Sequence, residues 1–359
     1  MASVTVLIFH RPPSSDDGPL TRALGEVRER LLAAHQEMFL IAGAAAVRVI
    51  DEWRPGKTFG EVLADEAPAR GGLVVLSSGA VPLLRRADAQ RLIAAAGAHE
   101  RQALTNNRYS SDVCAVSAAA VLRDLPSLPS DNALPRWLEE RAGYAVSELP
   151  SRDRLAVDLD TPLDVAIAGL APSCPAWLRH EARRHEFEVP RRDEMRSLAA
   201  NPHGEMLVFG RAGSRTLGWL ERNVRCRVRF LAEERGMRAS SPSAIGGSEK
   251  PHARQRRPLS TLGLLLVRDG PASLVNHVTG LSDGAILDSR VLIAQRFGAD
   301  EDRWPQAEDR YASDLLRSES IADDWLRELT IAASSAAIPI LLGGHSLVGP
   351  GIPLVIGRS

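Results

Sequence analysis

Short apolar runs of strand length recur along this chain, and segments of helical period lie between them. The clearest runs are Val4–Phe9 and Gly72–Ser77, which are apolar almost throughout, as expected of strands buried on both faces of a sheet. Between them, the segment 20–35 places leucines and a valine on one helical stripe. Strands that alternate with helices predict an α/β fold with an open, mostly parallel, Rossmann-like twisted sheet.

The same patterns predict the remaining elements. In the first half we expect further strands at 37–42, 112–117 and 154–159, and helices at 87–96, 132–141 and 162–170. The last of these helices has the clearest start, because Thr161 is a good N-cap and Pro162 suits the first helical position. In the second half we expect helices at 177–185 and 309–333 and strands at 206–210 and 262–267.

The chain length and one proline-rich break predict two domains. A chain of 359 residues exceeds the usual size of one domain. The segment 171–175 combines proline and serine and follows a predicted helix, so we expect an N-terminal domain at 1–170 and a second α/β domain at 171–359. The segment 240–258 is rich in serine, glycine, lysine and arginine and is typical of a mobile surface loop.

Composition argues against several classes of partner. The chain has 44 basic and 45 acidic side chains, which gives no overall attraction to nucleic acid. No apolar run approaches the ~18 residues that span a bilayer, and the segment 1–10 lacks the basic start of a signal peptide. Three widely spaced cysteines form no zinc or disulfide pattern. We therefore expect a cytoplasmic protein without nucleic-acid or membrane partners; its oligomeric state is left open.

Four segments of the first half occur in an order that points to one group of enzymes. They are LVVLSSGAVPLLRRAD at 73–88, ALTNNRYSSDVCAV at 103–116, LPSDNALPRWL at 128–138 and RLAVDLDTPLDVAIA at 154–168. In this order they resemble nucleotidyltransferases of the molybdenum-cofactor guanylyltransferase and 2-phospho-lactate guanylyltransferase type. The resemblance covers residues 1–170 and implies a nucleotide-diphospho-sugar transferase type of fold in that half.

The resemblance also implies site residues. Asp158 and Asp160 match acids of the Asp-x-Asp-Thr-Pro-x-Asp signature, which would bind Mg2+ and support nucleotidyl transfer. The residues expected to bind the nucleotide lie at the end of the expected strand 72–77 and ahead of the expected strand 112–117: Ser77, Ser78, Gly79, Asn106 and Asn107. A plainer reading is that Asp160 caps the helix after it and that the asparagines form a turn.

Two features depart from the family pattern. In the family, a short acidic turn after a strand supplies a metal ligand, whereas Ser78 and Gly79 occupy that turn here. The family also has a glycine-rich phosphate loop after the first strand, whereas this chain has HRPPSSDDGPL at 10–20. The prolines lack N–H donors and the aspartates repel phosphate, so this phosphate-loop motif is degenerate.

The second half carries its own polar candidates. The segment GRAGSRT at 210–216 joins a strand to a helix and offers Arg211 to an anion. Further on, four residues form a candidate acid/base set that we expect to converge in one pocket: His277, Asp283, Asp288 and His345.

Three functions follow from these patterns. The first is a nucleotidyltransferase-like protein that binds a nucleotide or nucleotide-sugar, or another phosphorylated metabolite, with metal-assisted transfer. The second is a non-catalytic ligand-binding or scaffold protein that keeps the fold without the phosphate loop. The third is an enzyme whose active site lies in the second domain.

Overall fold

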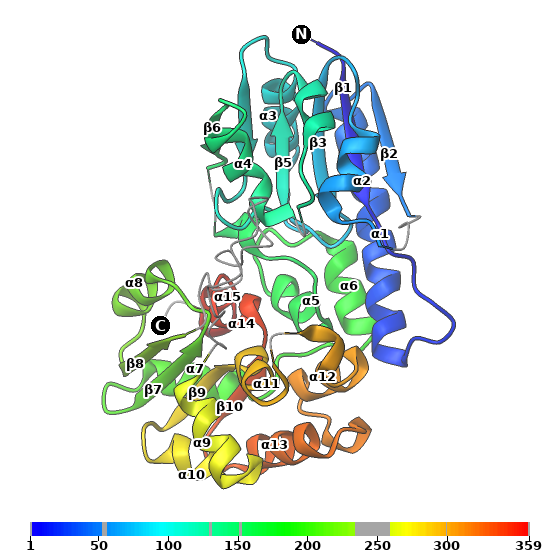
Figure 1. Cartoon of the computed structure of the whole chain (residues 1–359). Coiled ribbons are helices and arrows are strands. Elements are labelled where there is room, and N and C mark those ends of the chain that lie inside the picture. The colour runs from blue at the N-terminus through cyan, green and yellow to red at the C-terminus, as the bar shows by residue number, and fades with distance from the viewer. Residues whose placement is uncertain are drawn as a thin grey trace, which may run out of the picture. The chain divides into compact units, whose positions relative to one another are not determined.

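The computed structural model describes residues 2–51, 56–128, 131–150, 153–233, 259–298 and 300–357, which divide into two compact units (Figure 1). Among these residues, unit 1 comprises 2–14 and those from 25 to 159. Unit 2 comprises 15–24, 160–233 and those from 259 to 357. The division therefore falls ahead of the predicted break at 171–175, and the predicted mobile loop at 240–258 lies outside the described residues.

Unit 1 is built on a six-stranded sheet in the order β2-β1-β3-β5-β4-β6. Its strands are β1 (Val4–Phe9), β2 (Ala46–Ile50), β3 (Gly72–Ser77), β4 (Gln102–Thr105), β5 (Val113–Val116) and β6 (Ala145–Glu148). Only β5 runs antiparallel to its neighbours β3 and β4, while the other pairings are parallel. The predicted α/β class and mostly parallel sheet are confirmed.

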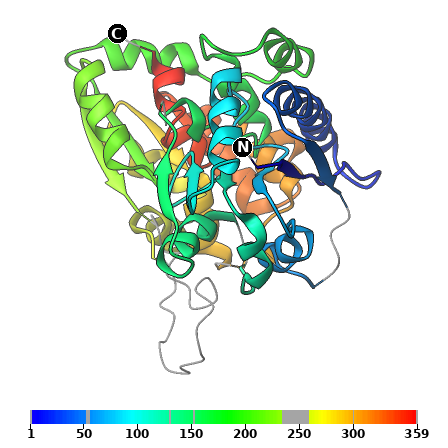
Figure 2. The ribbon, with the colours of Figure 1, turned by 90° about the horizontal axis from the view of Figure 1, so that it is seen from above.

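Helices cover both faces of this sheet. They are α1 (Pro19–Ile41), α2 (Phe59–Glu66), α3 (Arg86–Ala96) and α4 (Leu134–Glu140), with short 3-10 turns at Ala119–Asp124, Asp131–Ala133 and Arg154–Ala156. Leu7 and Phe9 pack in the core beneath α2 and α4, whereas Val6 and Ile8 pack in the core beneath α1 and α3. Figure 2 shows α1 and α2 on opposite sides of β1. Because successive strand side chains alternate between faces, two buried faces explain the unbroken apolar runs of β1 and β3.

Unit 2 contains a second, fully parallel sheet in the order β10-β9-β7-β8. Its strands are β7 (Glu205–Gly210), β8 (Arg227–Ala232), β9 (Gly284–Asp288) and β10 (Ile340–Gly343). Its longer helices are α5 (Pro162–Gly169), α6 (Ala176–Arg184), α7 (Arg192–Ala200), α8 (Ser214–Asn223), α9 (Thr261–Asp269), α11 (Ser289–Phe297), α12 (Ala307–Asp314) and α13 (Asp324–Ser335). Shorter helices are α10 (Leu274–Thr279), α14 (His345–Val348) and α15 (Ile352–Ile356).

Several predicted elements of the first half are wrong for identifiable reasons. The predicted strand at 37–42 is the last part of α1, which continues because His35 and Phe39, one helical turn apart, are both buried. The strand that follows is β2. The predicted strand at 154–159 starts with a 3-10 turn and belongs to neither sheet.

The second half shows a similar error at 262–267, which belongs to helix α9 and not to a strand. Leu262 and Leu266 are buried, but Leu264 and Val267 are exposed, so the apolar residues surround the helix and hide its period. The predicted helix at 309–333 is two helices, α12 and α13. Among the described helices, not one combines the length and apolarity that a bilayer span requires.

The start of α5 forms as predicted. Thr161 is the N-cap and its hydroxyl accepts a hydrogen bond from the Asp164 N–H at 3.2 Å. In return, Asp164 Oδ2 accepts from the Thr161 N–H at 2.7 Å and from the Asp160 N–H at 3.1 Å. The capping function considered for Asp160 is therefore performed by its neighbours, which form a capping box.

Candidate functional site

The strand order of unit 1 places a crevice at the carboxyl ends of β1 and β3. The chain leaves β1 to form β2 on one side and later forms β3 on the other side. In open α/β sheets, ligands bind outside the carboxyl ends of the strands at such a switch point. The residues that follow the two strands are His10 and Ser78, so the turn predicted to bind the nucleotide lies at this point.

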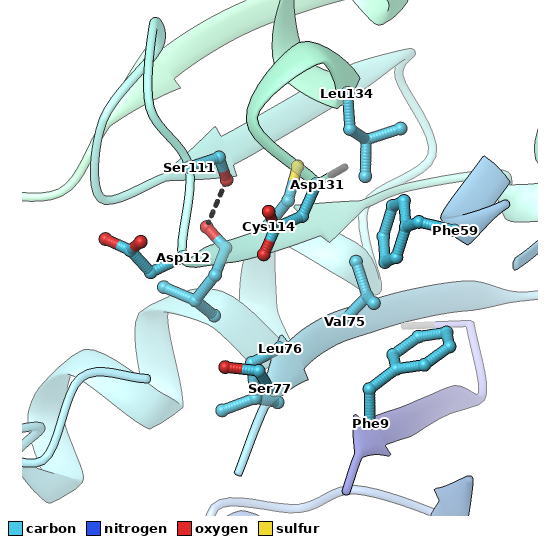
Figure 3. A pocket seen from close by; sticks show the side chains of 11 residues that line it. Phe9, Phe59, Val75, Leu76, Ser77, Ser111, Asp112, Cys114, Asp131 and Leu134 are labelled. Carbon is cyan, nitrogen blue, oxygen red and sulfur yellow. Dashed lines mark hydrogen bonds between the residues drawn. The ribbon is translucent and has the colours of Figure 1, made fainter. Parts of the chain in front are cut away.

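A pocket of about 250 Å3 opens at the same edge of the sheet (Figure 3). Its lining comes from β1, β3, β5, α2 and the start of α4: Phe9, Phe59, Val75, Leu76, Ser77, Ser111, Asp112, Val113, Cys114, Asp131 and Leu134. Ligand pockets for small molecules usually measure roughly 300–1,000 Å3. This pocket is slightly smaller, so it suits one ring system and not a whole nucleotide. Of the residues predicted to bind the nucleotide, only Ser77 lines it.

The two ends of the pocket differ in chemistry. Phe9 and Phe59 lie at one end in Figure 3, with ring centroids 5.1 Å apart and planes inclined at 50°. Ser111, Asp112 and Asp131 lie toward the other end. Lysine, arginine and histidine do not occur among the lining residues. The pocket therefore suits an apolar ring whose edge donates hydrogen bonds, and it disfavours phosphate because the carboxylates carry like charge.

Asn106 positions the acidic wall of the pocket and does not line it. Its Nδ2 donates to Asp112 Oδ2 at 2.6 Å and to the Leu155 carbonyl at 2.8 Å, and its Oδ1 accepts from the Asp112 N–H at 2.9 Å. Asn107 Oδ1 accepts from the Tyr109 N–H at 3.1 Å, as in an Asx turn. The structure thus gives both asparagines loop-forming hydrogen bonds, and their predicted contacts with a nucleotide stay a prediction.

His10 and Ser78 form a hydrogen-bonded pair at the switch point, with Nδ1 and Oγ 3.0 Å apart. The backbone fixes this pair, because the Ser78 N–H donates to the Phe9 carbonyl at 2.8 Å. Burial lowers the pKa of His10, while the charges of Glu29 and Asp51 oppose that shift. Sequence reasoning missed His10; its position directly after β1, opposite Ser78 in a parallel register, is the signal that could have found it.

Gly79 permits a close approach that ties two segments of unit 1 together. A Cβ there would lie 3.1 Å from both Arg28 Nε and the Leu159 carbonyl oxygen. Arg28 Nε donates to that oxygen at 2.8 Å, and the Leu159 N–H donates to the Gly79 carbonyl at 2.8 Å. Any side chain at Gly79 would separate these groups, so the glycine has a packing role beside the switch point.

The predicted metal ligands lie at the boundary between the units along the chain. Asp158 belongs to unit 1 and Asp160 is the first residue of this part of unit 2. No group of three His, Cys, Asp or Glu side chains in the described part of the chain is arranged to hold a metal ion. Asp164, which sequence reasoning did not select, is buried, and burial followed by the charge of Asp160 raises its pKa to about 7. The magnesium site stays a prediction.

In unit 2, the structure brings Arg211 and Asp288 together at the switch point between β7 and β9. The guanidinium donates to both carboxylate oxygens, at 2.7 Å and 3.1 Å, and the Arg211 N–H donates at 3.2 Å. Burial alone would raise the pKa of Asp288, but the charge of Arg211 outweighs it and the pKa is lowered. His345 follows β10 and therefore lies at the same edge of the sheet.

The other two members of the acid/base set lie elsewhere. Asp283 precedes β9 and accepts from the Glu205 N–H at 2.9 Å, whereas Asp288 ends the same strand. The two carboxylates thus lie at opposite edges of the sheet. His277 is on α10, with Nε2 3.1 Å from an oxygen of Asp269. The prediction that His277, Asp283, Asp288 and His345 converge in one pocket is wrong. The length of β9 lies between Asp283 at one edge of the sheet and Asp288 and His345 at the other.

A buried ion pair extends the polar edge of unit 2. Arg290 donates to the two oxygens of Asp314 at 2.8 Å and 2.6 Å, and also to Ser289 Oγ at 2.8 Å. Burial disfavours the charged guanidinium, but the adjacent carboxylate outweighs it and raises the pKa of Arg290. Both side chains use their polar groups on each other, so this part of the edge is structural.

The N-terminus of α1, where a phosphate loop would deliver its anion, already holds a carboxylate. Glu308 of α12 accepts from the Leu20 N–H at 2.8 Å and from the Thr21 N–H at 3.0 Å, all within unit 2. A Cβ at Gly18 would lie 2.3 Å from a carbon of the same side chain. Glu308 therefore takes two N–H groups at the start of α1 that an anion could otherwise use, and the degenerate phosphate-loop motif stays a prediction.

Comparison with known proteins adds no family: the sequence matches no family model and no curated protein.

Proposed function

We propose that unit 1 binds a nucleotide or nucleotide-sugar, as expected of a nucleotidyltransferase-like domain of the nucleotide-diphospho-sugar transferase type. The observation that carries the proposal is the pocket at the carboxyl edge of the sheet, beside the switch point. The ring of the base would enter beside Phe9 and Phe59, and its N–H donors would face Asp112 and Asp131. Guanine fits best, because its ring nitrogen and amino group present adjacent donors to a carboxylate.

The negative charge of the pocket determines how a bound nucleotide would be oriented. The lining contains two carboxylates and no basic side chain, so the phosphates would remain outside, beyond the ends of β1 and β3. The second part of the proposal is that Mg2+ at Asp158 and Asp160 supports nucleotidyl transfer to a phosphorylated metabolite. The alternative of a binding protein without catalysis is favoured by Glu308, which occupies the N-terminus of α1.

Calorimetric titration of the full chain tests the proposal. We expect GTP to bind more tightly than ATP, CTP or UTP, and Asp131→Asn to weaken GTP binding by about tenfold or more, because a hydrogen bond to a charged group is lost. Asp124→Asn is the matched control, since Asp124 is exposed in the same unit and does not line the pocket.

The outcomes separate the two parts of the proposal. Binding that improves with MgCl2 and weakens in Asp160→Asn would support the metal site. Binding that is changed neither by MgCl2 nor by Asp160→Asn would instead support a binding protein without metal-assisted transfer. Absence of binding by all four nucleotides at millimolar concentration would remove the nucleotide proposal altogether.

A further inference from the structure

We propose that Ser78 is a nucleophile activated by His10, and that the two form an ester-cleaving site at the carboxyl edge of unit 1. The inference goes beyond nucleotide binding and does not depend on it. Its basis is the 3.0 Å contact between Ser78 Oγ and His10 Nδ1 at a switch point where α/β sheets place their chemistry.

The backbone holds the pair in position without help from a ligand. Phe9 and Ser77 are partners in the parallel register of β1 and β3, so the next residues on the two strands lie side by side. The Ser78 N–H continues the ladder by donating to the Phe9 carbonyl at 2.8 Å, and the His10 N–H donates to the Ile50 carbonyl at 2.9 Å. A nucleophile and its base on rigid strand ends need little reorganisation before reaction.

The surroundings of His10 suit a general base. Burial is the largest influence and lowers its pKa, with a smaller contribution in the same direction from Arg28, so the imidazole is neutral near pH 7. Glu29 on α1 and Asp51 after β2 act in the opposite direction and favour the protonated ring. The negative charges of these carboxylates would stabilise the imidazolium that forms during proton transfer.

The segment that follows Ser78 contains a strained residue. Val81, three residues further on, has a φ of 43° although it is β-branched and fully buried. Such a conformation is a clear outlier for valine and is kept only where the surrounding structure enforces it. The strained residue is thus Val81, and Ser78 itself is not in the left-handed region.

The proposed substrate is a carboxylic ester whose apolar part enters the pocket. Ser77 lines this pocket, whereas Ser78 and His10 lie next to its lining residues Ser77 and Phe9 along the chain and do not line it themselves. Ser78 Oγ forms a bond to the ester carbonyl carbon while its proton passes to His10 Nδ1. The bond to the alcohol oxygen then breaks, and His10 returns the proton to that oxygen. Water attacks the acyl-serine with the same proton transfers, which releases the carboxylic acid and restores both residues.

An active-site label and a model ester test the proposal on the full chain. An alkyl fluorophosphonate should modify Ser78, located by peptide mass spectrometry, and p-nitrophenyl acetate should be cleaved. His10→Gln should lower both rates by about 100-fold or more, as loss of a general base does. The matched control is His99→Gln, because His99 is exposed in the same unit and far along the chain from the site. Labelling that misses Ser78, or that is equal in wild type and His10→Gln, would overturn the proposal.

A second variant covers the case in which Ser78 is poorly reached by the phosphonate. In Ser78→Cys, the adjacent imidazole should increase the thiolate fraction, so iodoacetamide should modify position 78 faster than the native cysteines. Ser78 is buried, with 5% of its surface exposed, and the three cysteines are buried as well, so a faster rate at position 78 would report activation by the imidazole and not greater exposure. Burial raises the pKa of Cys114 to about 12, which makes it a slow internal reference. A rate at position 78 that is no faster than that of Cys114, or that His10→Gln leaves unchanged, would count against activation by His10. Nucleotide binding is measured in a separate titration, so a failure of the ester-cleavage proposal can be distinguished from a failure of the nucleotide-binding proposal.

Discussion

Asp314→Asn is expected to lower the free energy of unfolding by about 3–5 kcal/mol, because it leaves a buried guanidinium without its counter-charge. Arg290 and Asp314 are both buried in unit 2 and share two hydrogen bonds. The asparagine keeps the shape of the side chain, removes its charge and replaces one of the two oxygens that accept from Arg290 by an NH2 donor. Chemical denaturation followed by tryptophan fluorescence measures the effect, since Trp304 and Trp325 belong to this unit.

Two further variants distinguish a lost ion pair from a general disturbance. Asp324→Asn breaks an exposed pair with Arg327, and surface pairs contribute only about 0–1 kcal/mol. The double variant Asp314→Asn with Arg290→Met should recover part of the stability, because it removes the unpaired charge. A loss in Asp314→Asn no greater than that in Asp324→Asn would show that the buried pair is not important for stability.

The second large effect is a loss of stability of about 3 kcal/mol as the pH falls from 6.5 to 4, caused by His35. Neither ring nitrogen of this buried side chain makes a hydrogen bond of good geometry, although the Val81 backbone lies close enough to favour the charged form slightly. Burial lowers the pKa from 6.5 to about 4. The unfolded chain therefore binds a proton that the folded chain rejects, and stability rises with pH across this window.

His35→Leu isolates this effect. The leucine fills the buried position without an unsatisfied polar group, so the variant should be as stable as wild type or more so, and it should lack this part of the acid loss. His99→Gln, at an exposed histidine, should keep the slope of the wild type. Unfolding curves at several pH values between 4 and 7 provide the comparison. Equal slopes in wild type and His35→Leu would show that His35 is not the titrating group.

The elements that sequence predicted well are those with strong local signals. The ends of β1 and β3 were found because their apolar runs stop at polar turns, and the start of α5 was found from Thr161 and Pro162. The errors arose where tertiary packing overrides local pattern. The apolar residues of α9 surround the helix. No strand is predicted at 227–232, where edge strand β8 alternates arginine with apolar residues and its arginines at 227 and 229 pair with Glu205 of β7.

The candidate site was predicted only in part, because it depends on pairings between distant strands. Ser77 and Ser78 were selected since they follow a buried strand, and they do lie at the switch point. His10 becomes significant only once β1 is known to pair with β3. Phe59 and Asp131 reach the pocket from elements far along the chain, and no local pattern marks them. The antiparallel direction of β5, which brings Asp112 to the carboxyl edge, was likewise hidden from the sequence.

The central claim is that the pocket at the carboxyl edge of unit 1 holds the ring of a nucleotide. The most direct test is a crystal structure of the full chain grown with GTP. The account predicts the guanine ring beside Phe9 and Phe59, with its N–H groups donating to Asp112 and Asp131 and its phosphates outside the pocket. A guanine ring bound at any other place on the molecule, or phosphates inside this pocket, would contradict it.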